Sequence, residues 1–395
     1  MEDRKLALHN ECYGCNACIS SCPVSAVTKR EDDKGFLYPS IDYEKCINCH
    51  KCEEVCLGVH QSHPFNEPIA CFALQHKDDK VLLKSSSGGA FVAISDYILS
   101  KKGVVFGAVY DSENVRVIHS IAHNPLERDK MCGSKYVQSD MQDTLLSLKE
   151  CLNNGEIVLF SGTPCQIAAV YSFLGNKVYS NLFTIDLICH GIPSPKVFRS
   201  HIKYEEKKQK SKIVDYKFRS KIFGYEHNNE AVFENKKREC SIHTKRIMKF
   251  YTMNMRDSCY ECQFANSKRV GDLSIGDLWR KPKYVDLRKV SGLSTVLVNT
   301  EKGNLLLEAI KDKVELVPLK DQFNRSALSH PVEHTEKVDE FWDFFSSHSY
   351  EEVLDKYARL SVKSYIYFYL VKYLHTLCGS VGDRVIEYLQ RKYAE

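Results

Sequence analysis

The chain has 395 residues, 43% of them hydrophobic and 27% charged, which allows one large or two medium-sized domains with hydrophobic cores. A formal net charge of only +4, without an arginine-rich stretch, excludes a nucleic-acid-binding protein, and no apolar run is as long as a membrane span. Seventeen cysteines in a chain that begins Met-Glu-Asp-Arg-Lys, with no apolar signal region, predict a reducing, cytoplasmic location.

Eight of the cysteines form two runs of identical spacing, 34 residues apart. The runs are Cys12-x2-Cys15-x2-Cys18-x3-Cys22, followed by Pro23, and Cys46-x2-Cys49-x2-Cys52-x3-Cys56. This spacing is typical of bacterial ferredoxins with two [4Fe–4S] clusters, in which the fourth cysteine of each run binds the other cluster. We therefore predict one cluster on Cys12, Cys15, Cys18 and Cys56, and a second on Cys46, Cys49, Cys52 and Cys22. The alternatives are a zinc site, which usually takes two CxxC pairs with a long spacer, and a disulfide framework, which suits a secreted chain.

After a polar linker near residues 60–64, the pattern predicts a strand over Ile69–Leu74 and the loop Ser85–Gly89 before a helix over Ala90–Ser100. Two strand-like runs, Val104–Val109 and Val115–Ile118, flank a turn and predict a β-hairpin. A helical pattern then continues through residue 151 and ends at an Asn-Asn-Gly sequence.

A short apolar run over Ile157–Phe160 is followed by Thr163 and Pro164, which suit the cap and first turn of a helix. The next apolar run, Leu182–Ile188, completes a strand, helix, strand sequence that predicts a parallel βαβ unit. The lysine-rich stretch over Tyr204–Arg246 predicts exposed hairpins and connections.

The chain from about residue 350 has a helical pattern, and residues 364–377 are crowded with tyrosine, phenylalanine and leucine. One interpretation is a helix packed on the core or on a partner chain. The other is an amphipathic helix lying on a membrane surface. The first is favoured because the pattern lacks a continuous polar face.

Four later cysteines lie at the ends of predicted elements. Cys165 follows a helix cap, Cys189 ends a strand, and Cys259-x2-Cys262 lies in a polar stretch. Because parallel strands end at one edge of a sheet, these thiols could close a third cluster. From the spacing alone, a shared cluster and separate roles for these cysteines are equally supported. In the second interpretation Cys165 is a thiolate at a helix start, Cys189 is buried, and the CxxC loop is empty or binds zinc.

An ordered series of motifs resembles the family of coenzyme F420 hydrogenase/dehydrogenase beta subunits over residues 68–320. The motifs are Ser87-Gly88-Gly89-Ala90, Gly133-Ser134-Lys135-Tyr136-Val137-Gln138-Ser139, Gly162-Thr163-Pro164-Cys165-Gln166, Cys189-His190-Gly191, Cys259-x2-Cys262 and Gly271-Asp272-Leu273-Ser274-Ile275-Gly276-Asp277-Leu278-Trp279. The resemblance implies FAD on an α/β module and favours a third [4Fe–4S] cluster on Cys165, Cys189, Cys259 and Cys262.

A cofactor-binding set follows from this resemblance together with the residue types. The Ser85–Gly89 loop offers hydroxyls and backbone N–H groups before a helix, which suits a pyrophosphate. Lys135 could pair with a phosphate or tune the flavin, and Thr163 and Gln166 lie at a helix start near the flavin edge. The expected set is Ser86, Ser87, Gly88, Gly89, Lys135, Thr163 and Gln166, and the catalytic residues stay unassigned.

The expected fold is a multidomain α+β and α/β protein. It comprises a bacterial-type two-cluster ferredoxin fold over 1–65, an α/β flavin-binding and iron–sulfur-binding module over 66–325, and a helical tail over 326–395. The expected function is an iron–sulfur flavoprotein oxidoreductase that passes electrons between clusters and FAD and to an organic substrate, F420 or another carrier. The alternatives are an electron-transfer subunit of a larger hydrogenase- or dehydrogenase-like complex and, less favoured, an interaction protein with structural clusters. Expected partners are an electron donor or acceptor protein such as ferredoxin, or a redox-complex subunit.

Overall fold

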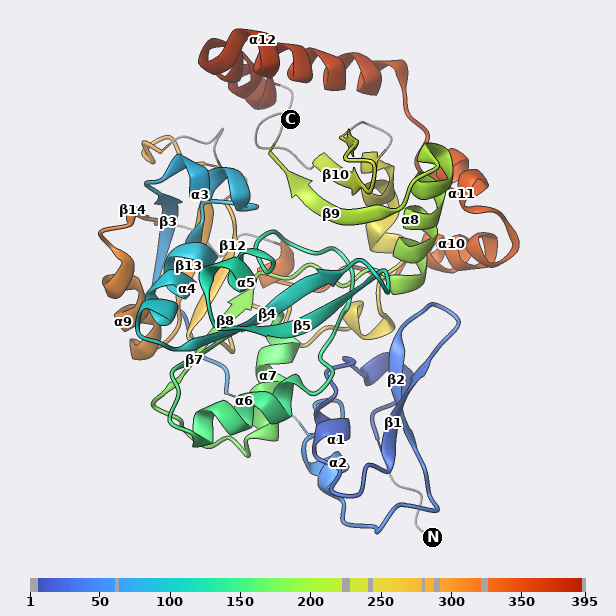
Figure 1. The fold of residues 1–395 in the computed structure, drawn as a ribbon, viewed down its shortest axis with the longest axis vertical. Helices are drawn as coiled ribbons and strands as arrows, with labels where there is room; N and C mark the ends of the chain where they lie inside the picture. The colour runs from blue at the N-terminus through green and yellow to red at the C-terminus, as the bar shows by residue number, and fades with distance from the viewer. Residues whose placement is uncertain are drawn as a thin grey trace.

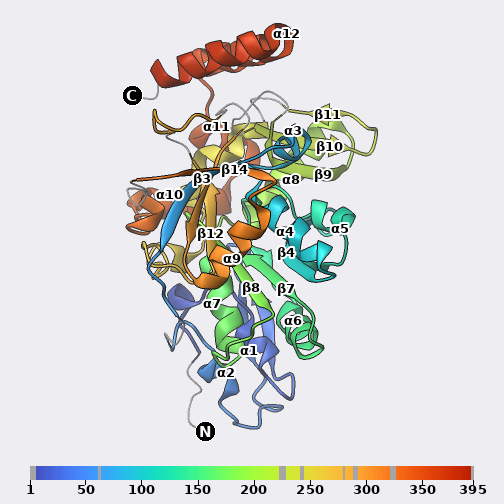
Figure 2. The ribbon, with the colours of Figure 1, turned by 90° about the vertical axis from the view of Figure 1, so that its left-hand side faces the viewer.

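A computed structural model describes residues 6–60, 64–221, 228–240, 244–278, 281–287, 292–320 and 326–392. Within them the chain forms a small cysteine-rich region, a large mixed sheet covered by helices, a second small sheet, and a helical C-terminal part (Figure 1). The cysteine-rich region and the last helix lie at opposite ends of the molecule in both perpendicular views (Figures 1 and 2).

The cysteine-rich region repeats its backbone as well as its sequence. Its elements are η1 (His9–Glu11), α1 (Ala17–Ser20), β1 (Val27–Glu31), β2 (Leu37–Ile41) and α2 (Lys51–Glu54). The two short helices begin 34 residues apart, and each follows a left-handed residue, Asn16 with a φ of 60° and His50 with a φ of 59°. Gly14 and Asn48, at φ values of 64° and 59°, are a second equivalent pair. We refer to residues 9–57 as the ferredoxin region.

Nine strands of the described chain form one mixed sheet in the order β14-β3-β13-β12-β8-β7-β4-β5-β6. Their bounds are β3 (Ala70–His76), β4 (Val104–Asp111), β5 (Arg116–Ala122), β6 (Ser139–Asp140), β7 (Val158–Gly162), β8 (Leu182–Leu187), β12 (Leu273–Asp277), β13 (Ser294–Val298) and β14 (Val314–Pro318). The central strands β12, β8, β7 and β4 run parallel, whereas β13, β3, β14 and β5 extend the sheet with antiparallel pairs. The carboxyl ends of the central strands therefore lie at one edge.

Alternating residues of the central strands face two separate cores, as the two-residue period of a strand requires. Helices α3 (Asp79–Lys84), α4 (Ala90–Ser100), α5 (Pro125–Asp129), α6 (Thr144–Asn153), α7 (Pro164–Phe173) and α9 (Glu301–Ile310) flank the sheet. Val105 and Leu159 pack with α4 and α9 on one face. Phe106 and Phe160 pack with α6 and α7 on the other face, and Ala17 of the ferredoxin region joins this second core. The ferredoxin region thus packs against the α6/α7 face.

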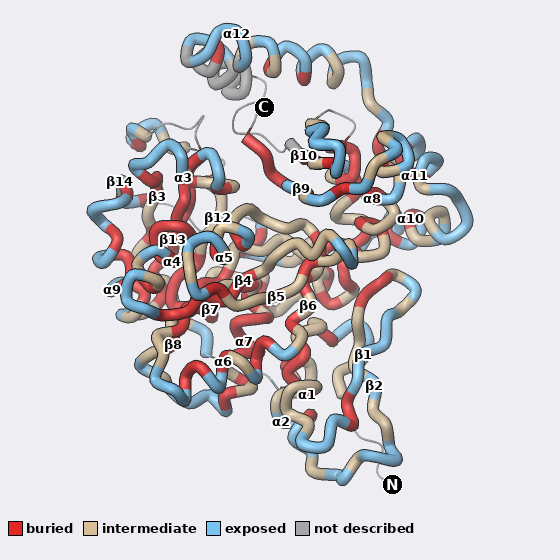
Figure 3. Tube along the Cα trace, viewed as in Figure 1, coloured by how far each residue is buried: buried red, intermediate tan, exposed pale blue. Residues whose placement is uncertain are grey.

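A second sheet packs with the helices that follow it. The sheet consists of β9 (Ile213–Ser220), β10 (Asn228–Phe233) and β11 (Arg238–Glu239), and it packs with α8 (Pro195–Gln209), η2 (Thr244–Met253), α10 (Glu336–Ser347) and α11 (Tyr350–Tyr357). Of the remaining short helices, η3 (Asp257–Cys259) follows η2 in the chain, and η5 (Ser326–Leu328) packs against the large sheet. Phe198, Phe250 and Phe341, from three separate elements, are buried in one shared core. The last helix, α12 (Val362–Lys392), lies above this layer, and most of the side chains described between Val362 and Val381 are exposed (Figure 3). No described helix is long and apolar enough to cross a membrane.

Several predicted elements are confirmed. The helix over Ala90–Ser100 has the expected bounds, the β4–β5 hairpin is antiparallel, and β7, α7 and β8 form the expected parallel unit. Thr163 caps α7, and Pro164 occupies its first turn. The mixed α/β architecture with a ferredoxin-like region agrees with the expectation, but the sheet adds antiparallel strands on both sides of its parallel centre, and α8 occupies the start of the stretch expected to form hairpins.

Candidate functional site

The first predicted cysteine set, Cys12, Cys15, Cys18 and Cys56, is brought together under the α6/α7 face. Burial raises the pKa of Cys15 to about 12, and the neighbouring charges of Cys12 and Cys56 contribute to this rise. The pKa of Cys18 is raised well above its usual value by burial and by Cys15, Cys12 and Cys56. Each thiol thus opposes ionisation of the others, so that holding them as thiolates requires a cationic centre such as the irons of a cluster. We call these four residues the inner set.

The second predicted set, Cys22, Cys46, Cys49 and Cys52, lies toward solvent, with Cys52 buried and the other three half-buried. Cys22, Cys18 and Cys52 share one small apolar cluster. Burial by itself would raise the pKa of Cys22, but the backbone N–H groups of Val24 and Ala26 outweigh it and lower the pKa. The N–H of Ala26 donates to Cys22 Sγ at 3.2 Å. We call these four cysteines the outer set.

The third set joins thiols from three separate parts of the chain. Cys165 lies in the first turn of α7, Cys189 follows β8, Cys259 ends η3, and Cys262 follows three residues later. Burial raises the pKa of Cys165 well above its usual value, and the charges of Cys262, Cys189 and Cys259 add to this effect. Burial likewise raises the pKa of Cys189 to about 11. The structure therefore brings together the four thiols expected to hold a third cluster.

A buried ion pair holds the elements of the third set in place. Arg269 donates to Asp186 at 2.6 Å, and the two side chains are 1% and 0% exposed. The same guanidinium donates to the carbonyl groups of Leu187, Phe264 and Asn266 at 3.2–3.3 Å. It thus ties the end of β8, which precedes Cys189, to the segment that follows Cys262.

Tyr13 lies between the inner set and the third set. It belongs to the loop between Cys12 and Cys15, and its ring packs edge-on against Phe264 with 5.3 Å between centroids. The pKa of Tyr13 is raised first by burial and then by the charges of Cys262 and Cys165. A buried aromatic side chain from the ferredoxin region therefore reaches the surroundings of the third set.

The described residues contain no group of three histidine, cysteine, aspartate or glutamate side chains that could hold a single metal ion. The ligands of a cubane cluster bind four different irons at its corners and are spread further apart than the ligands of one ion.

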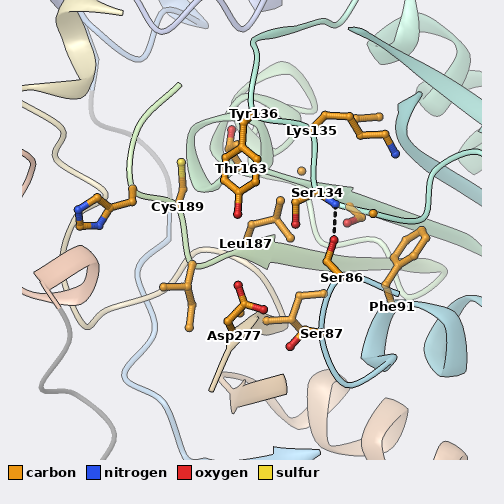
Figure 4. A pocket seen from close by; sticks show the side chains of 18 of the residues that line it. Ser86, Ser87, Phe91, Ser134, Lys135, Tyr136, Thr163, Leu187, Cys189 and Asp277 are labelled. Carbon is orange, nitrogen blue, oxygen red and sulfur yellow. Dashed lines mark hydrogen bonds between the residues drawn. The ribbon is translucent and has the colours of Figure 1, made fainter. Parts of the chain in front are cut away.

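A cavity of about 1120 Å³ opens at the carboxyl edge of the central strands (Figure 4). Ligand pockets usually enclose about 300–1,000 Å³, so this one can take a large cofactor. Cys165 and Cys189 belong to its wall, which places the third set beside it. Of the residues predicted to bind a cofactor, those that line it are Ser86, Ser87, Gly89, Lys135, Thr163 and Gln166.

The serine–glycine loop opens into this cavity at the start of α4. Ser86 Oγ accepts the N–H of Ser134 at 2.7 Å (Figure 4), whereas Ser87 Oγ donates to the Leu293 carbonyl at 2.5 Å. Gly89 is left-handed, with a φ of 85°, and α4 has no side-chain cap. Gly88 is a buried packing position, because a Cβ there would lie 2.1 Å from the Leu74 carbonyl oxygen. The first turn of α4 is thus left available to an anionic group.

Other predicted cofactor residues have structural contacts of their own. Lys135 Nζ donates to the carbonyl groups of Lys130, Met131 and Cys132 at 2.8–3.1 Å, and burial lowers its pKa to about 8. The Gln166 side chain accepts the N–H of Thr163 and donates to Ser139 Oγ, both at 2.9 Å. The structure thus directs the Lys135 ammonium to the end of α5.

His119 in β5 lines the cavity, although the sequence offered no sign of it. Its Nε2 donates to the Ser161 carbonyl at 3.2 Å, and its ring stacks on Phe160. The side chain is buried, and among the described residues Nδ1 has no hydrogen-bond partner. Burial lowers the pKa of His119 to about 4, so the ring is neutral and Nδ1 is an acceptor. A buried acceptor without a partner fits a ligand that carries a donor.

Comparison with known proteins agrees with this geometry. Residues 11–57 match the 4Fe-4S dicluster domain. Residues 155–322 match the family described as the C terminus of the coenzyme F420 hydrogenase/dehydrogenase beta subunit. This family match confirms the resemblance seen in the sequence, and the dicluster match supports iron–sulfur binding in the ferredoxin region.

Two known proteins are similar to much of this chain. The F subunit of the F(420)H(2) dehydrogenase from Methanosarcina mazei is 22% identical over 329 residues, which cover 78% of this chain and 85% of that protein. A chain in the solved structure of the F420-reducing [NiFe] hydrogenase complex from Methanosarcina barkeri is 19% identical, with a TM-score of 0.47, and the match covers 74% of this chain and 92% of that one.

Proposed function

We propose that the chain is an iron–sulfur flavoprotein oxidoreductase with three [4Fe–4S] clusters and one FAD. The proposal rests on one observation above all, which is that the cysteine sets and the cavity form a continuous series. The inner set meets the third set at Tyr13, and Cys165 and Cys189 belong to both the third set and the cavity wall. Redox groups arranged in this way can exchange electrons between the surface of the ferredoxin region and a ligand in the cavity.

FAD would supply the ability to exchange electrons singly with clusters and as a pair with an organic carrier. The described residues fit this group. The first turn of α4 and the serine loop suit its pyrophosphate, and His119 Nδ1 suits a donor of its ring system. The organic carrier would enter the same cavity, and coenzyme F420 or another two-electron carrier is the proposed class because the family description and the Methanosarcina mazei relative name F420.

The test is the iron and flavin content of the full chain after anaerobic purification. About twelve irons and one FAD per chain are expected from three clusters and a flavin. Cys165→Ser should remove about four irons and leave the rest, because only the third set loses a ligand. Cys132→Ser is the matched control, since this thiol lines the cavity but belongs to none of the three sets. About eight irons without flavin would contradict the proposed third cluster and flavin.

A second candidate is an electron-transfer subunit with no substrate of its own. Two observations favour it. The Methanosarcina mazei relative is a subunit of a dehydrogenase, and α12 exposes Ile366, Tyr369 and Leu370 by 64%, 52% and 42%. Turnover of reduced F420 by the isolated chain would support the oxidoreductase. Turnover only after a co-purified partner is added back would support the subunit.

A further inference from the structure

Arg256 is a buried cation placed directly against the inner set. Its residue is 1% exposed, and it lies three positions before Cys259 of the third set. Its Nε donates to the Cys12 carbonyl at 2.5 Å, and its Nη2 lies 3.4 Å from Cys12 Sγ and 3.1 Å from the Leu37 carbonyl. Its Nη1 donates to Gln138 Oε1 at 2.9 Å. The guanidinium also stacks over the Tyr38 ring at 4.0 Å.

The charge of Arg256 is not balanced by a carboxylate. Within the described chain no aspartate or glutamate lies at ion-pair distance from it, and the adjacent Asp257 instead pairs with Lys34 at 2.8 Å and His9 at 3.2 Å. A buried guanidinium that lacks a counter-charge is costly by several kcal/mol. The sulfur that it contacts is Cys12 Sγ of the inner set, which lies 3.4 Å from Nη2.

The outer set has different surroundings. Cys22 Sγ accepts the neutral N–H of Ala26, and Cys46 Sγ lies 3.9 Å from the amide oxygen of Asn48. Hydrogen bonds to the ligand sulfurs, solvent exposure and nearby charge are the levers by which a protein sets the potential of a cluster. A cation stabilises the reduced form, because reduction adds negative charge.

We propose that Arg256 raises the potential of the cluster on the inner set above the value that this cluster would have without the charge. The inference rests on the proposed function, because it assumes clusters on both sets. A one-electron donor to the ferredoxin region would give up one electron and the inner set's cluster would take it up, with no proton transferred. The charge of Arg256 would thus favour an electron beside Tyr13 and the body of the protein.

The test is a redox titration of the full, anaerobically purified chain, followed by electron paramagnetic resonance. Arg256→Gln keeps a hydrogen-bond donor and removes the charge, whereas Arg256→Lys keeps the charge. The glutamine variant should lower the reduction potential of one ferredoxin-region cluster by at least about 59 mV, which is a tenfold change in the equilibrium constant for one-electron reduction. The lysine variant should retain most of the wild-type value.

Arg199→Gln is the matched control. Arg199 pairs with Glu31 of the ferredoxin region at 2.6 Å, but its side chain is 30% exposed, and its removal should leave every potential unchanged. If Arg256→Gln holds its full iron content and its potentials equal those of the wild type, the inference is overturned while the proposed function stands. A wild-type chain without the eight ferredoxin-region irons expected from two clusters overturns both.

If Arg256→Gln loses iron, the Arg256→Lys variant tests the inference instead. If the lysine variant keeps its iron and an unchanged potential, the charge is what the inner cluster requires, and the inference is supported. If the lysine variant also loses about four irons, the planar guanidinium has a structural role only, and the inference is overturned.

Discussion

The ferredoxin region and the sheet module gather cysteines in opposite ways. In the ferredoxin region each run lies within eleven residues, and short loops with left-handed residues bend the chain around the thiols. In the sheet module the four thiols come from the start of α7, the end of β8, and η3 with the loop that follows it, and they converge through the packing of these separate elements. A site built from one loop depends on local backbone, whereas a site built from strand ends depends on the whole core.

The largest effect is expected at the buried Arg269–Asp186 pair, whose loss should affect the third set and not the ferredoxin region. Arg269→Met leaves Asp186 buried without its partner, and breaking such a pair costs about 3–5 kcal/mol. Because Arg269 ties the end of β8 to the segment after Cys262, the variant should also lose about four irons of about twelve. Chemical unfolding and iron analysis measure both effects.

Lys268→Ala is the neighbouring control for Arg269→Met. Its ammonium pairs with Glu67 at 3.3 Å, and the two side chains are 57% and 69% exposed, so the change should alter the free energy of unfolding by less than about 0.5 kcal/mol. Loss of iron from the ferredoxin region in Arg269→Met, with the third set intact, would contradict the comparison.

A second effect concerns the cavity wall and depends on pH. The folded pKa of His119 is about 4, against an ordinary value of 6.5, because of burial, with Lys135 lowering and Asp140 raising it. Between pH 6.5 and pH 4 the unfolded chain therefore binds a proton at His119 that the folded chain does not bind. The contribution of His119 to the free energy of unfolding is fully present above pH 6.5 and is lost as the pH falls toward 4. At about 1.36 kcal/mol per pKa unit, the total is about 3 kcal/mol.

His119→Phe should accordingly flatten the dependence of the free energy of unfolding on pH between 6.5 and 4, measured by urea unfolding beside the wild type. His201, whose pKa burial lowers to about 3, is unchanged in both proteins and serves as the internal reference. Equal slopes for the two proteins would show that folding does not lower the pKa of His119, against the expectation.

The third prediction tests the joint between the two regions. Gly14 has a φ of 64°, and a Cβ there would lie 2.5 Å from Gln138 Nε2 and 2.8 Å from Arg256 Nη1. Gly14→Ala should lower the free energy of unfolding by about 1–3 kcal/mol, from overpacking added to backbone strain. Gly155→Ala is the matched control, since its φ is 78° with nothing within 4 Å of the new Cβ, and it measures the strain alone. Similar losses of stability in both variants would show that Gln138 and Arg256 move aside to admit the new Cβ at no cost.

The smallest effect is expected at the serine loop. Ser86→Ala removes the acceptor for the Ser134 N–H and should reduce stability by about 1 kcal/mol. The iron content should stay the same, because neither residue lies near the cysteine sets in the chain. Ser100→Ala, which removes an exposed hydroxyl at the end of α4, is the control. A fall in iron content in Ser86→Ala would show that the serine loop also supports the third set.

Sequence reasoning was most successful where a signal is local. The spacing of the eight cysteines, the Ala90–Ser100 helix and the cap at Thr163 all depend on neighbouring residues. The family resemblance raised the four later cysteines to one predicted set, which spacing alone left open. Lys135 was expected to pair with a phosphate or to tune the flavin, and the three carbonyl groups that its ammonium contacts could not be foreseen from the sequence.

Other site features could not be read from the sequence because they depend on distant partners. His119 sits in a strand whose alternation says only that it faces the same side as Val117. Arg256 contacts a residue 244 positions away, and the pairing of Arg269 with Asp186 spans 83 positions. The order of strands in the sheet likewise joins β3 to β13 and β14, a choice that no local pattern specifies.

The equivalent positions of the cysteine repeat carry Gly14 in the first half and Asn48 in the second. Gly14 meets Gln138 and Arg256 at a place with no room for a Cβ, whereas Asn48 is exposed. A two-fold repeat could in principle attach to a body by either face. Here the absence of a side chain at Gly14 allows this half of the repeat, and not the other, to occupy the position beside Gln138 and Arg256. The duplicated module can therefore attach in only one orientation.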